Sequence, residues 1–256
     1  ATRIVLIGDF SNWEELPQYE LKQLAGGVWE RKMPLKAMTH GQHFKMKVYW
    51  KGGSGERIPA WARRVVQDEA TKIFSAQVWA PKEQYVFKNK KFTPKRTPLL
   101  IYECHIGMAQ EEEKVGTYRE FREKVLPRVA ADGYNCIQIM AIQEHPYYGS
   151  FGYQVSSFYA ASSWFGHPDD LKYLINKAHE MGIRVLLDIV HSHAVSNTTE
   201  GINMFDGTTW QFFHDGAKGD HPTWGTKCFN YGKDEVIHFL LSNLKFWMTE
   251  YHFDGF

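Results

Sequence analysis

The segment Ile183-Arg184-Val185-Leu186-Leu187-Asp188-Ile189-Val190-His191-Ser192-His193 indicates a buried β-strand that runs into a polar loop. Its apolar residues form a nearly continuous run, which is typical of a parallel strand covered on both faces. Asp188 interrupts this run, and a carboxylate inside a buried strand is costly unless it is paired. His191 and His193 follow within five residues. The segment therefore predicts a core strand with a polar site at its carboxyl end.

The chain after residue 98 alternates between strand-like and helix-like patterns. Such alternation predicts a parallel sheet with helices packed against it. Strands are expected at residues 99–106, 135–142, 183–190 and 252–256, and helices at residues 117–132, 168–181 and 234–251.

Local signals mark the ends of these helices. Thr117 and Glu120 have the spacing of a capping box, and Pro127 is expected to kink or split the helix that they open. Pro168 stands near the first position of the next helix, followed by two acidic residues, and Gly182 is expected to end it. These helices therefore have ends that can be predicted without tertiary information.

The first part of the chain has an all-β pattern. Strands are expected at residues 3–8, 28–33 and 43–50, with turns or loops at 26–27 and 52–55. Short strands of this kind predict a small β-sandwich. Residues 88–98 are basic and contain two prolines, which indicates a domain boundary. We therefore expect a β-sandwich over residues 1–96 and an α/β domain over residues 97–256.

Two architectures fit the α/β part: an open doubly wound sheet, or the first half of an eight-stranded (β/α)8 barrel, also called a TIM barrel. Long loops follow the second and third strands, and residues 194–233 are expected to form the longest. Barrel enzymes build their active sites from loops at the carboxyl ends of strands, which favours the barrel. About four β/α units would leave sheet edges unpaired, so we expect the chain to be a fragment of a longer protein.

Composition limits the classes of function. The 256 residues carry 30 basic and 29 acidic side chains, a balance that argues against nucleic acid or an anionic membrane as partner. The chain lacks an apolar run of bilayer length, and its start as a short strand leads us to expect no signal peptide. Its three cysteines are expected to be free thiols in a reducing compartment. Aromatic residues make up 15% of the chain and often lie in loops, which suggests sugar binding, although ordinary packing explains many of them.

Several motifs resemble the 1,4-α-glucan branching enzymes, which belong to the α-amylase superfamily of glycoside hydrolases. The motifs in the α/β part are Ile101–Met108, Met140–His145, Ser150–Val155, Asp188–His193, Asn203–Gly207 and Phe239–Leu244. Gly8–Trp13 resembles the start of the immunoglobulin-like, glycogen-binding β-sandwich that precedes the barrel in this family. The similarity covers nearly the whole chain.

The resemblance implies a donor-sugar site. Tyr153 would stack on the donor glucose, Gln154 would lie beside it, and His193 would hydrogen-bond it, whereas Asp188 would support an active-site arginine. The family uses a retaining mechanism with two carboxyl groups, in which a glucan 6-hydroxyl replaces water as acceptor. Its nucleophile and general acid would lie beyond Phe256, so the resemblance implies that this chain has no catalytic residue and is inactive alone.

In the sandwich, the resemblance implies glucan contacts by Trp13 and Lys47. Trp50 and Trp61 are further candidates, although strand packing is the simpler interpretation of Trp50. The expected partner is a glycogen- or starch-type α-glucan, with no nucleic acid and no membrane. The open half-barrel surface would also permit association. The expected location is the cytoplasm, or the plastid if the source is a plant.

Alternatives remain at this stage. The His-x-His pattern of His191 and His193 also occurs in zinc sites, but no further ligand set completes it, so neither metal nor cofactor is expected. Asp188 could instead cap backbone N–H groups. The chain could act only as a glucan-binding module, or belong to a debranching or hydrolysing enzyme of the same superfamily.

Overall fold

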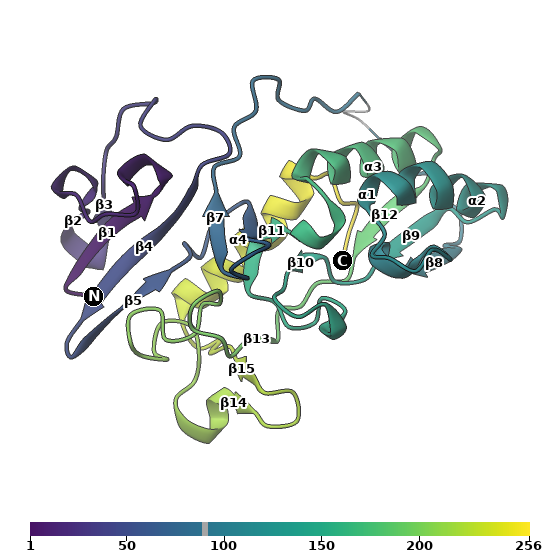
Figure 1. Ribbon diagram of the computed structural model, residues 1–256. Coiled ribbons are helices and arrows are strands. Elements are labelled where there is room, and N and C mark those ends of the chain that lie inside the picture. Colours follow the sequence, from purple (N-terminus) through teal and green to yellow (C-terminus); the bar gives the residue numbers. More distant parts are fainter. Residues whose placement is uncertain (89–91) are drawn as a thin grey trace.

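The N-terminal part forms an antiparallel sheet. The computed structural model describes residues 1–88 and 92–256 (Figure 1). Within this part of the chain, four strands pair in the order β1-β4-β7-β6, and β5 also pairs with β4. Their bounds are β1 Arg3–Gly8, β4 His43–Trp50, β5 Gly53–Arg57, β6 Val65–Gln67 and β7 Phe74–Gln77. A separate hairpin joins β2 Lys22–Gln23 to β3 Trp29–Glu30.

Two expectations for this part need revision. The loop predicted at residues 52–55 is wrong, because Gly53 begins strand β5, which pairs with β4 down to Arg57 opposite Met46. The expected two-layer sandwich is not confirmed. Some buried residues of the sheet, including Val65 and Ala76, pack in a cluster with Ala160 of the second part. Part of the sheet therefore packs against another region of the chain.

The second part contains a parallel sheet in sequential order. Strands β8 Ile101–Cys104, β9 Cys136–Ile139 and β12 Arg184–Leu187 are neighbours in that order, and Gly255 adjoins Leu186 as the next parallel position. A doubly wound sheet reverses its order at a switch point. The sequential order therefore favours the barrel over the doubly wound alternative.

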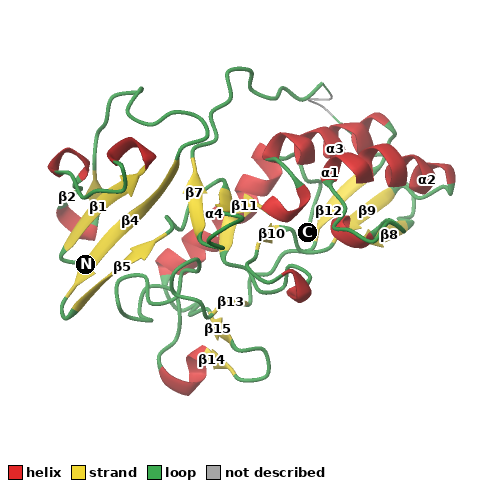
Figure 2. Ribbon diagram, viewed as in Figure 1, coloured by secondary structure: helices red, strands yellow, loops and turns green. Residues whose placement is uncertain are grey.

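Helices lie along the outer face of these strands, as Figure 2 shows for α1, α2 and α3. The helices are α1 Tyr118–Glu120, α2 Leu126–Ala131, α3 Pro168–Glu180 and α4 Asp234–Glu250, and a π-helical segment spans Phe121–Val125. Short 3₁₀ turns occur at Asp9–Ser11, Pro17–Tyr19, Ala25–Gly27, Ile106–Met108, Tyr148–Ser150, Ser163–Phe165 and Gly216–Gly219.

The predicted helix signals are confirmed. Thr117 accepts a hydrogen bond from the Glu120 backbone N–H at 3.1 Å, and the Glu120 carboxylate accepts from the Thr117 backbone N–H at 3.1 Å. Pro127 lies in the first turn of α2, directly after the π-helical segment that interrupts the helix. Gly182 has a φ of 76° just past α3, the conformation for which a helix end favours glycine.

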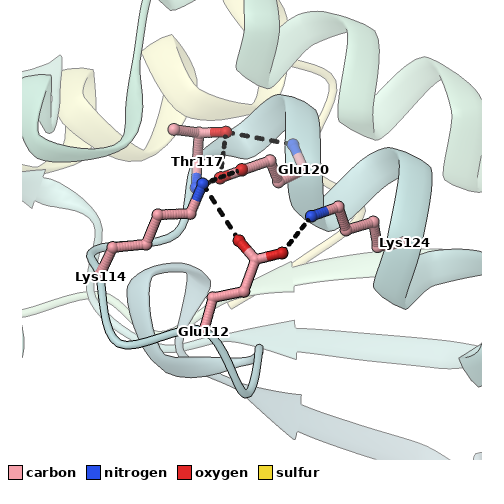
Figure 3. A network of polar contacts seen from close by, with 5 residues as sticks. All are labelled: Glu112, Lys114, Thr117, Glu120 and Lys124. Carbon is pink, nitrogen blue, oxygen red and sulfur yellow. Dashed lines mark hydrogen bonds and ion pairs between the residues drawn. The ribbon is translucent and has the colours of Figure 1, made fainter.

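An ion-pair network surrounds this capping box (Figure 3). Lys114 bridges the carboxylates of Glu112 and Glu120, and Lys124 reaches Glu112 at 2.7 Å. The hydrogen bond from Lys114 is the main reason that the pKa of Glu120 falls to about 2. The negative charge of Glu120 is thereby retained at the helix N-terminus, where it is favourable.

The loops after the second and third strands are more structured than expected. Residues 194–233 are not one long loop, because they carry most of a small antiparallel sheet of the order β13-β15-β14. Its strands are β13 His193–Val195, β14 Asp220–His221 and β15 Thr226–Cys228. The loop after β9 contains a second pair, β10 Gln143–Glu144 with β11 Ser157–Ala161. These sheets project from the carboxyl ends of the barrel strands and shape the site.

Two arginines connect the N-terminal sheet to these loops. Arg57 donates to the carbonyl oxygen of Met204 at 2.8 Å, and Arg64 donates to that of Gly166 at 2.7 Å. Figure 1 places β11 and α4 between the N-terminal sheet and the parallel strands. Residues 89–91 of the predicted domain boundary lie outside the described residues.

The core lies between the parallel strands and the helices. Its largest fully buried side chains are Trp247, Tyr118, Tyr251, Phe121, Phe158 and Phe165. Along α4, Phe239 and Trp247 are buried, whereas Leu244 is only half-buried and Asn243 is buried beside it. Among the described residues, none of the helices has the length and apolar character that a membrane crossing requires.

Candidate functional site

Three of the predicted donor-site residues meet at the carboxyl ends of β9 and β12. The Tyr153 hydroxyl donates to the Asp188 carboxylate, with 2.5 Å between the oxygens. The His193 Nε2 atom lies 2.8 Å from the carbonyl oxygen of Tyr153. The fourth residue, Gln154, extends the same loop, and its amide donates to the carbonyl oxygen of Trp224 at 3.2 Å. The structure thus brings together residues that are far apart in the sequence.

The hydrogen-bond partners of His193 and Tyr153 define the protonation state of each side chain. Because a carbonyl oxygen only accepts, His193 carries its proton on Nε2, and its Nδ1 accepts from the Ser192 hydroxyl at 2.8 Å. Burial lowers the pKa of His193, so the neutral ring is favoured. Burial, together with the hydrogen bond to Asp188, raises the pKa of Tyr153, which keeps its hydroxyl protonated as a donor.

Asp188 is half-buried and directly follows strand β12. Its carboxylate accepts from a phenol, whereas the sequence left open that it caps backbone N–H groups. The Asp188 backbone N–H donates to Ile139 at 2.9 Å, which continues the ladder between β12 and β9. The parallel sheet therefore fixes the backbone, and the loop after β9 supplies the partner of the side chain.

Gly152 allows Tyr153 to reach this position. Its φ is 93°, and a Cβ atom placed there would lie 1.8 Å from the carbonyl oxygen of Ala141. Only glycine fits such a close approach of two backbone segments. The Ser-Phe-Gly-Tyr motif thus has a steric reason for its glycine.

His191 and His193 point to different partners. The Nε2 atom of His191 lies 2.9 Å from the side-chain oxygen of Asn243 on α4, whereas His193 contacts the Tyr153 loop. No group of three or more His, Cys, Asp or Glu side chains within the described residues is arranged to hold a metal ion. The zinc interpretation therefore lacks a ligand set in this part of the chain.

A buried polar layer supports the site from below. The amide of Gln143 donates to the Phe158 carbonyl at 3.0 Å and to Asn243 at 3.1 Å. Glu144 accepts from the Ser163 backbone N–H at 2.7 Å, and burial raises its pKa to about 7. Burial also lowers the pKa of His145 to about 4. These groups form a buried polar layer next to the strand ends.

The N-terminal sheet carries a separate groove of about 860 Å³. Trp13 lines it with 40% of the residue exposed, and the indole N–H donates to Asp9 at 3.0 Å. The ammonium group of Lys45 lies 5.9 Å from the indole centroid. Lys45 lines the groove, whereas Lys47 is not among its lining residues. Lys45 and Lys47 share one face of β4, so periodicity alone could not choose between them.

The other two tryptophan candidates have packing roles. Trp50 lies under the guanidinium of Arg57, 5.2 Å from its carbon, and against the backbone of Gly207. Trp61 packs on Tyr159 at a centroid distance of 4.5 Å, although 47% of it is exposed. The structure thus supports the packing interpretation of Trp50.

One aromatic residue beside the donor site was missed in the sequence. The ring of Trp224 lies 5.2 Å from that of His193, and 54% of the residue is exposed. The hairpin that carries it falls in residues expected as loop. The only signal was compositional, namely a tryptophan followed by glycine.

Comparisons with known proteins agree with this geometry. The family model of the α-amylase catalytic domain matches residues 126–233. A crystal structure described as an α-amylase from Salmonella typhimurium superposes with a TM-score of 0.78 at 25% identity, covering 99% of this chain and 39% of that one. The catalytic module of the glycogen-degrading pneumococcal virulence factor SpuA superposes with a TM-score of 0.75 at 18% identity, covering all of this chain and 43% of that module. The chain therefore shares its fold with α-amylase-type proteins, and residues 126–233 resemble the α-amylase catalytic domain.

Curated relatives narrow this class. The chain is 50% identical to a 1,4-α-glucan-branching enzyme of Yarrowia lipolytica, 48% to that of Dictyostelium discoideum and 46% to that of Equus caballus, over all of its own length in each comparison. It spans 37–38% of the length of these enzymes. The chain is thus a relative of the 1,4-α-glucan-branching enzymes, and the resemblance drawn from its motifs is confirmed.

Proposed function

We propose that the chain contributes the donor side of a 1,4-α-glucan branching site. Such an enzyme cleaves an α-1,4 bond and transfers the glucan chain to a 6-hydroxyl, which forms an α-1,6 branch. The observation that carries the proposal is the hydrogen-bonded set of Tyr153, Asp188 and His193 at the carboxyl ends of two barrel strands. Barrel enzymes place their substrates at that end.

Each residue has a role that suits its chemistry. The aromatic face of Tyr153 receives the apolar face of the donor glucose, and Asp188 fixes the orientation of the ring through the hydroxyl. Gln154 offers amide groups to sugar hydroxyls. Both nitrogens of His193 already have protein partners, so His193 positions the Tyr153 segment, and direct sugar binding requires one of these hydrogen bonds to be exchanged.

The proposed reaction is a retaining double displacement with a covalent glycosyl-enzyme intermediate. A carboxylate nucleophile and a carboxylic general acid carry out this chemistry, and the resemblance assigns Asp188 to neither role. Asp188 therefore serves as a positioning residue. Incubation of amylose with a protein that joins this chain to the rest of a barrel tests the reaction, because new branches shift the iodine spectrum and increase the number of isoamylase-sensitive bonds.

Binding can be tested on the 256-residue chain itself. Titration with maltoheptaose is expected to show weaker binding by about tenfold in Tyr153→Ala, which removes one sugar-stacking ring. Tyr173→Ala, on helix α3, is the matched control and is expected to bind like the wild type. Equal affinity of Tyr153→Ala and wild type would refute the donor site, whatever the reaction.

The groove on the N-terminal sheet provides a second glucan contact in this proposal. Trp13 adopts a φ of 64°, which is unusual for a bulky residue, and its hydrogen bond to Asp9 holds the ring at the surface. Trp13 and Lys47 would form this contact, as the resemblance implies, and Lys45, which is buried and donates to Glu56 at 3.0 Å, would support the indole. Native gels containing glycogen test it: Trp13→Ala and Lys47→Ala should lose retardation, and wild-type retardation of both variants would refute the contact.

Domain limits, location and assembly complete the proposal. We place the domain boundary near residue 96, since the N-terminal sheet ends with β7 at Gln77 and β8 begins at Ile101. A reducing compartment such as the cytoplasm suits the three free cysteines. The exposed residues Leu99 and Leu100 next to β8 offer an apolar edge for association, which sedimentation at several protein concentrations would detect.

A further inference from the structure

Trp224 is an exposed aromatic side chain at the tip of a well-defined hairpin. Strands β14 and β15 pair through Asp220 with Lys227 and His221 with Thr226. The backbone N–H groups of Trp224 and Gly225 both donate to the carbonyl of His221, at 3.2 and 2.9 Å. Gly225 has a φ of 62°, which the tight turn requires. The hairpin therefore holds Trp224 in one place.

The hairpin is built onto the donor site. Strand β15 pairs with β13, in which His193 lies opposite Cys228. The carbonyl oxygen of Trp224 accepts from the amide of Gln154, which follows Tyr153 in the chain. Both the strand of His193 and the loop of Tyr153 thus bind the segment that carries Trp224.

The indole ring is backed by an imidazole. The rings of Trp224 and His221 are stacked, with centroids 4.1 Å apart and an angle of 3° between the planes. His221 covers one face of the indole, yet 54% of Trp224 remains exposed. A tryptophan that contributes to a hydrophobic core is not exposed to this extent. A rigid, supported and exposed ring next to a polar amide is instead the arrangement that binds an amphipathic ring.

We infer that Trp224, supported by His221, is a stacking platform for a glucosyl unit adjoining the donor glucose. The inference rests on the proposed function, because it takes the sugar at Tyr153 and His193 as its reference point. The ligand class is a linear α-1,4-glucan of two or more units, whose C–H face contacts the indole. Gln154, between Tyr153 and Trp224, offers its amide to hydroxyls of the two neighbouring sugars.

The platform makes binding affinity depend on the length of the glucan. A single glucose unit occupies only the Tyr153 position, whereas an oligosaccharide also reaches Trp224. An aromatic contact of this kind is expected to improve affinity by about two- to tenfold. The effect of removing Trp224 should therefore be seen with maltoheptaose and be absent with methyl α-glucoside.

Calorimetric titration of the 256-residue chain tests the inference. Trp224→Ala should weaken maltoheptaose binding by about two- to tenfold, and Trp224→Phe should recover most of it, because an aromatic face is restored. Trp210→Ala is the matched control: Trp210 lies in the same region with 65% exposure, and its ring is occupied by the ammonium of Lys233 at 3.4 Å. It should bind like the wild type.

A second measurement does not depend on how well the alanine variant folds. Maltoheptaose should protect the wild-type chain from acrylamide quenching of tryptophan fluorescence, and the protection should shrink in Trp224→Phe. Wild-type affinity in Trp224→Ala, with binding lost in Tyr153→Ala, would overturn the inference and leave the proposed function intact. Absence of maltoheptaose binding by the wild type would overturn both.

Discussion

The hydroxyl oxygen of Tyr153 lies 2.5 Å from a carboxylate oxygen of Asp188, although 35 positions separate the two residues in the chain. The contact joins the loop after β9 to the end of β12. Hydrogen bonds to a charged acceptor are shorter and stronger than neutral ones. This one therefore ties the orientation of the Tyr153 ring to the end of strand β12.

Removal of Asp188 should destabilise the fold around Tyr153. In Asp188→Ala the buried hydroxyl loses its acceptor, which is expected to cost about 1–3 kcal/mol of unfolding free energy. Tyr153→Phe leaves the carboxylate with access to solvent and should cost about 1 kcal/mol. Urea unfolding of both single variants and the double variant measures the coupling. Strictly additive effects would show that the two side chains do not interact.

Gly152 should tolerate no side chain. In Gly152→Ala the new Cβ would lie 1.8 Å from the Ala141 carbonyl oxygen, so the loop must shift, and the expected loss exceeds about 3 kcal/mol. Gly182→Ala is the control: its φ is also positive, but the Cβ meets no atom within 4 Å, and about 1 kcal/mol is expected. Thermal unfolding compares the two variants. Equal losses would mean that only the backbone conformation matters.

The capping box of α1 should contribute to the free energy of unfolding. Thr117→Ala removes the acceptor for the Glu120 backbone N–H and is expected to cost about 1 kcal/mol. Thr249→Ala, in the exposed last turn of α4, should change stability by less than about 0.5 kcal/mol. Chemical denaturation of both variants provides the measurement, and a larger loss at Thr249 would contradict the assigned role of the cap.

Glu144 should make stability depend on pH. Burial raises its folded pKa from 4.5 to about 7, so the folded state holds the proton more tightly than the unfolded state. Its stabilising contribution is complete below pH 4.5 and is lost as the pH rises through about 7, by roughly 3 kcal/mol. His145 acts in the opposite sense, because its folded pKa is lowered to about 4 and its contribution is lost as the pH falls.

The variant Glu144→Gln isolates the carboxylate. The amide oxygen can still accept from the Ser163 N–H, and the nearby Arg64 is unchanged. The difference in unfolding free energy between the variant and the wild type should therefore shift in favour of the variant between pH 5 and 8. A constant difference across this range would show that Glu144 does not titrate in it.

Much of the helical framework followed from local chemistry. The capping residues Thr117 and Glu120, the interruption near Pro127 and the glycine end at Gly182 act within a few residues, so their consequences were predictable. The strand at Gly53–Arg57 was not, because its pairing with β4 outweighs the low strand propensity of three glycines and a serine in residues 52–55. The hairpin that carries Trp224 was missed for a similar reason.

The distinction between Lys45 and Lys47 shows the same limit within one strand. Both side chains belong to one face of β4, and only the position of Trp13, set by its turn and by Asp9, brings Lys45 to 5.9 Å from the indole. Likewise, the strand order that favours the barrel depends on which strands pair across the sheet.

The sequence by itself determined the alternation of strands and helices, the polar break at Asp188 and the motifs that identified Tyr153, Gln154 and His193. Only the tertiary structure decided that Tyr153 binds Asp188, that Trp224 lies beside His193, and that the N-terminal sheet packs on Ala160. The physical reason is the distance along the sequence over which each signal acts. Periodicity and capping report the few residues around a position, whereas these contacts join distant segments whose meeting depends on how the whole chain closes around its core.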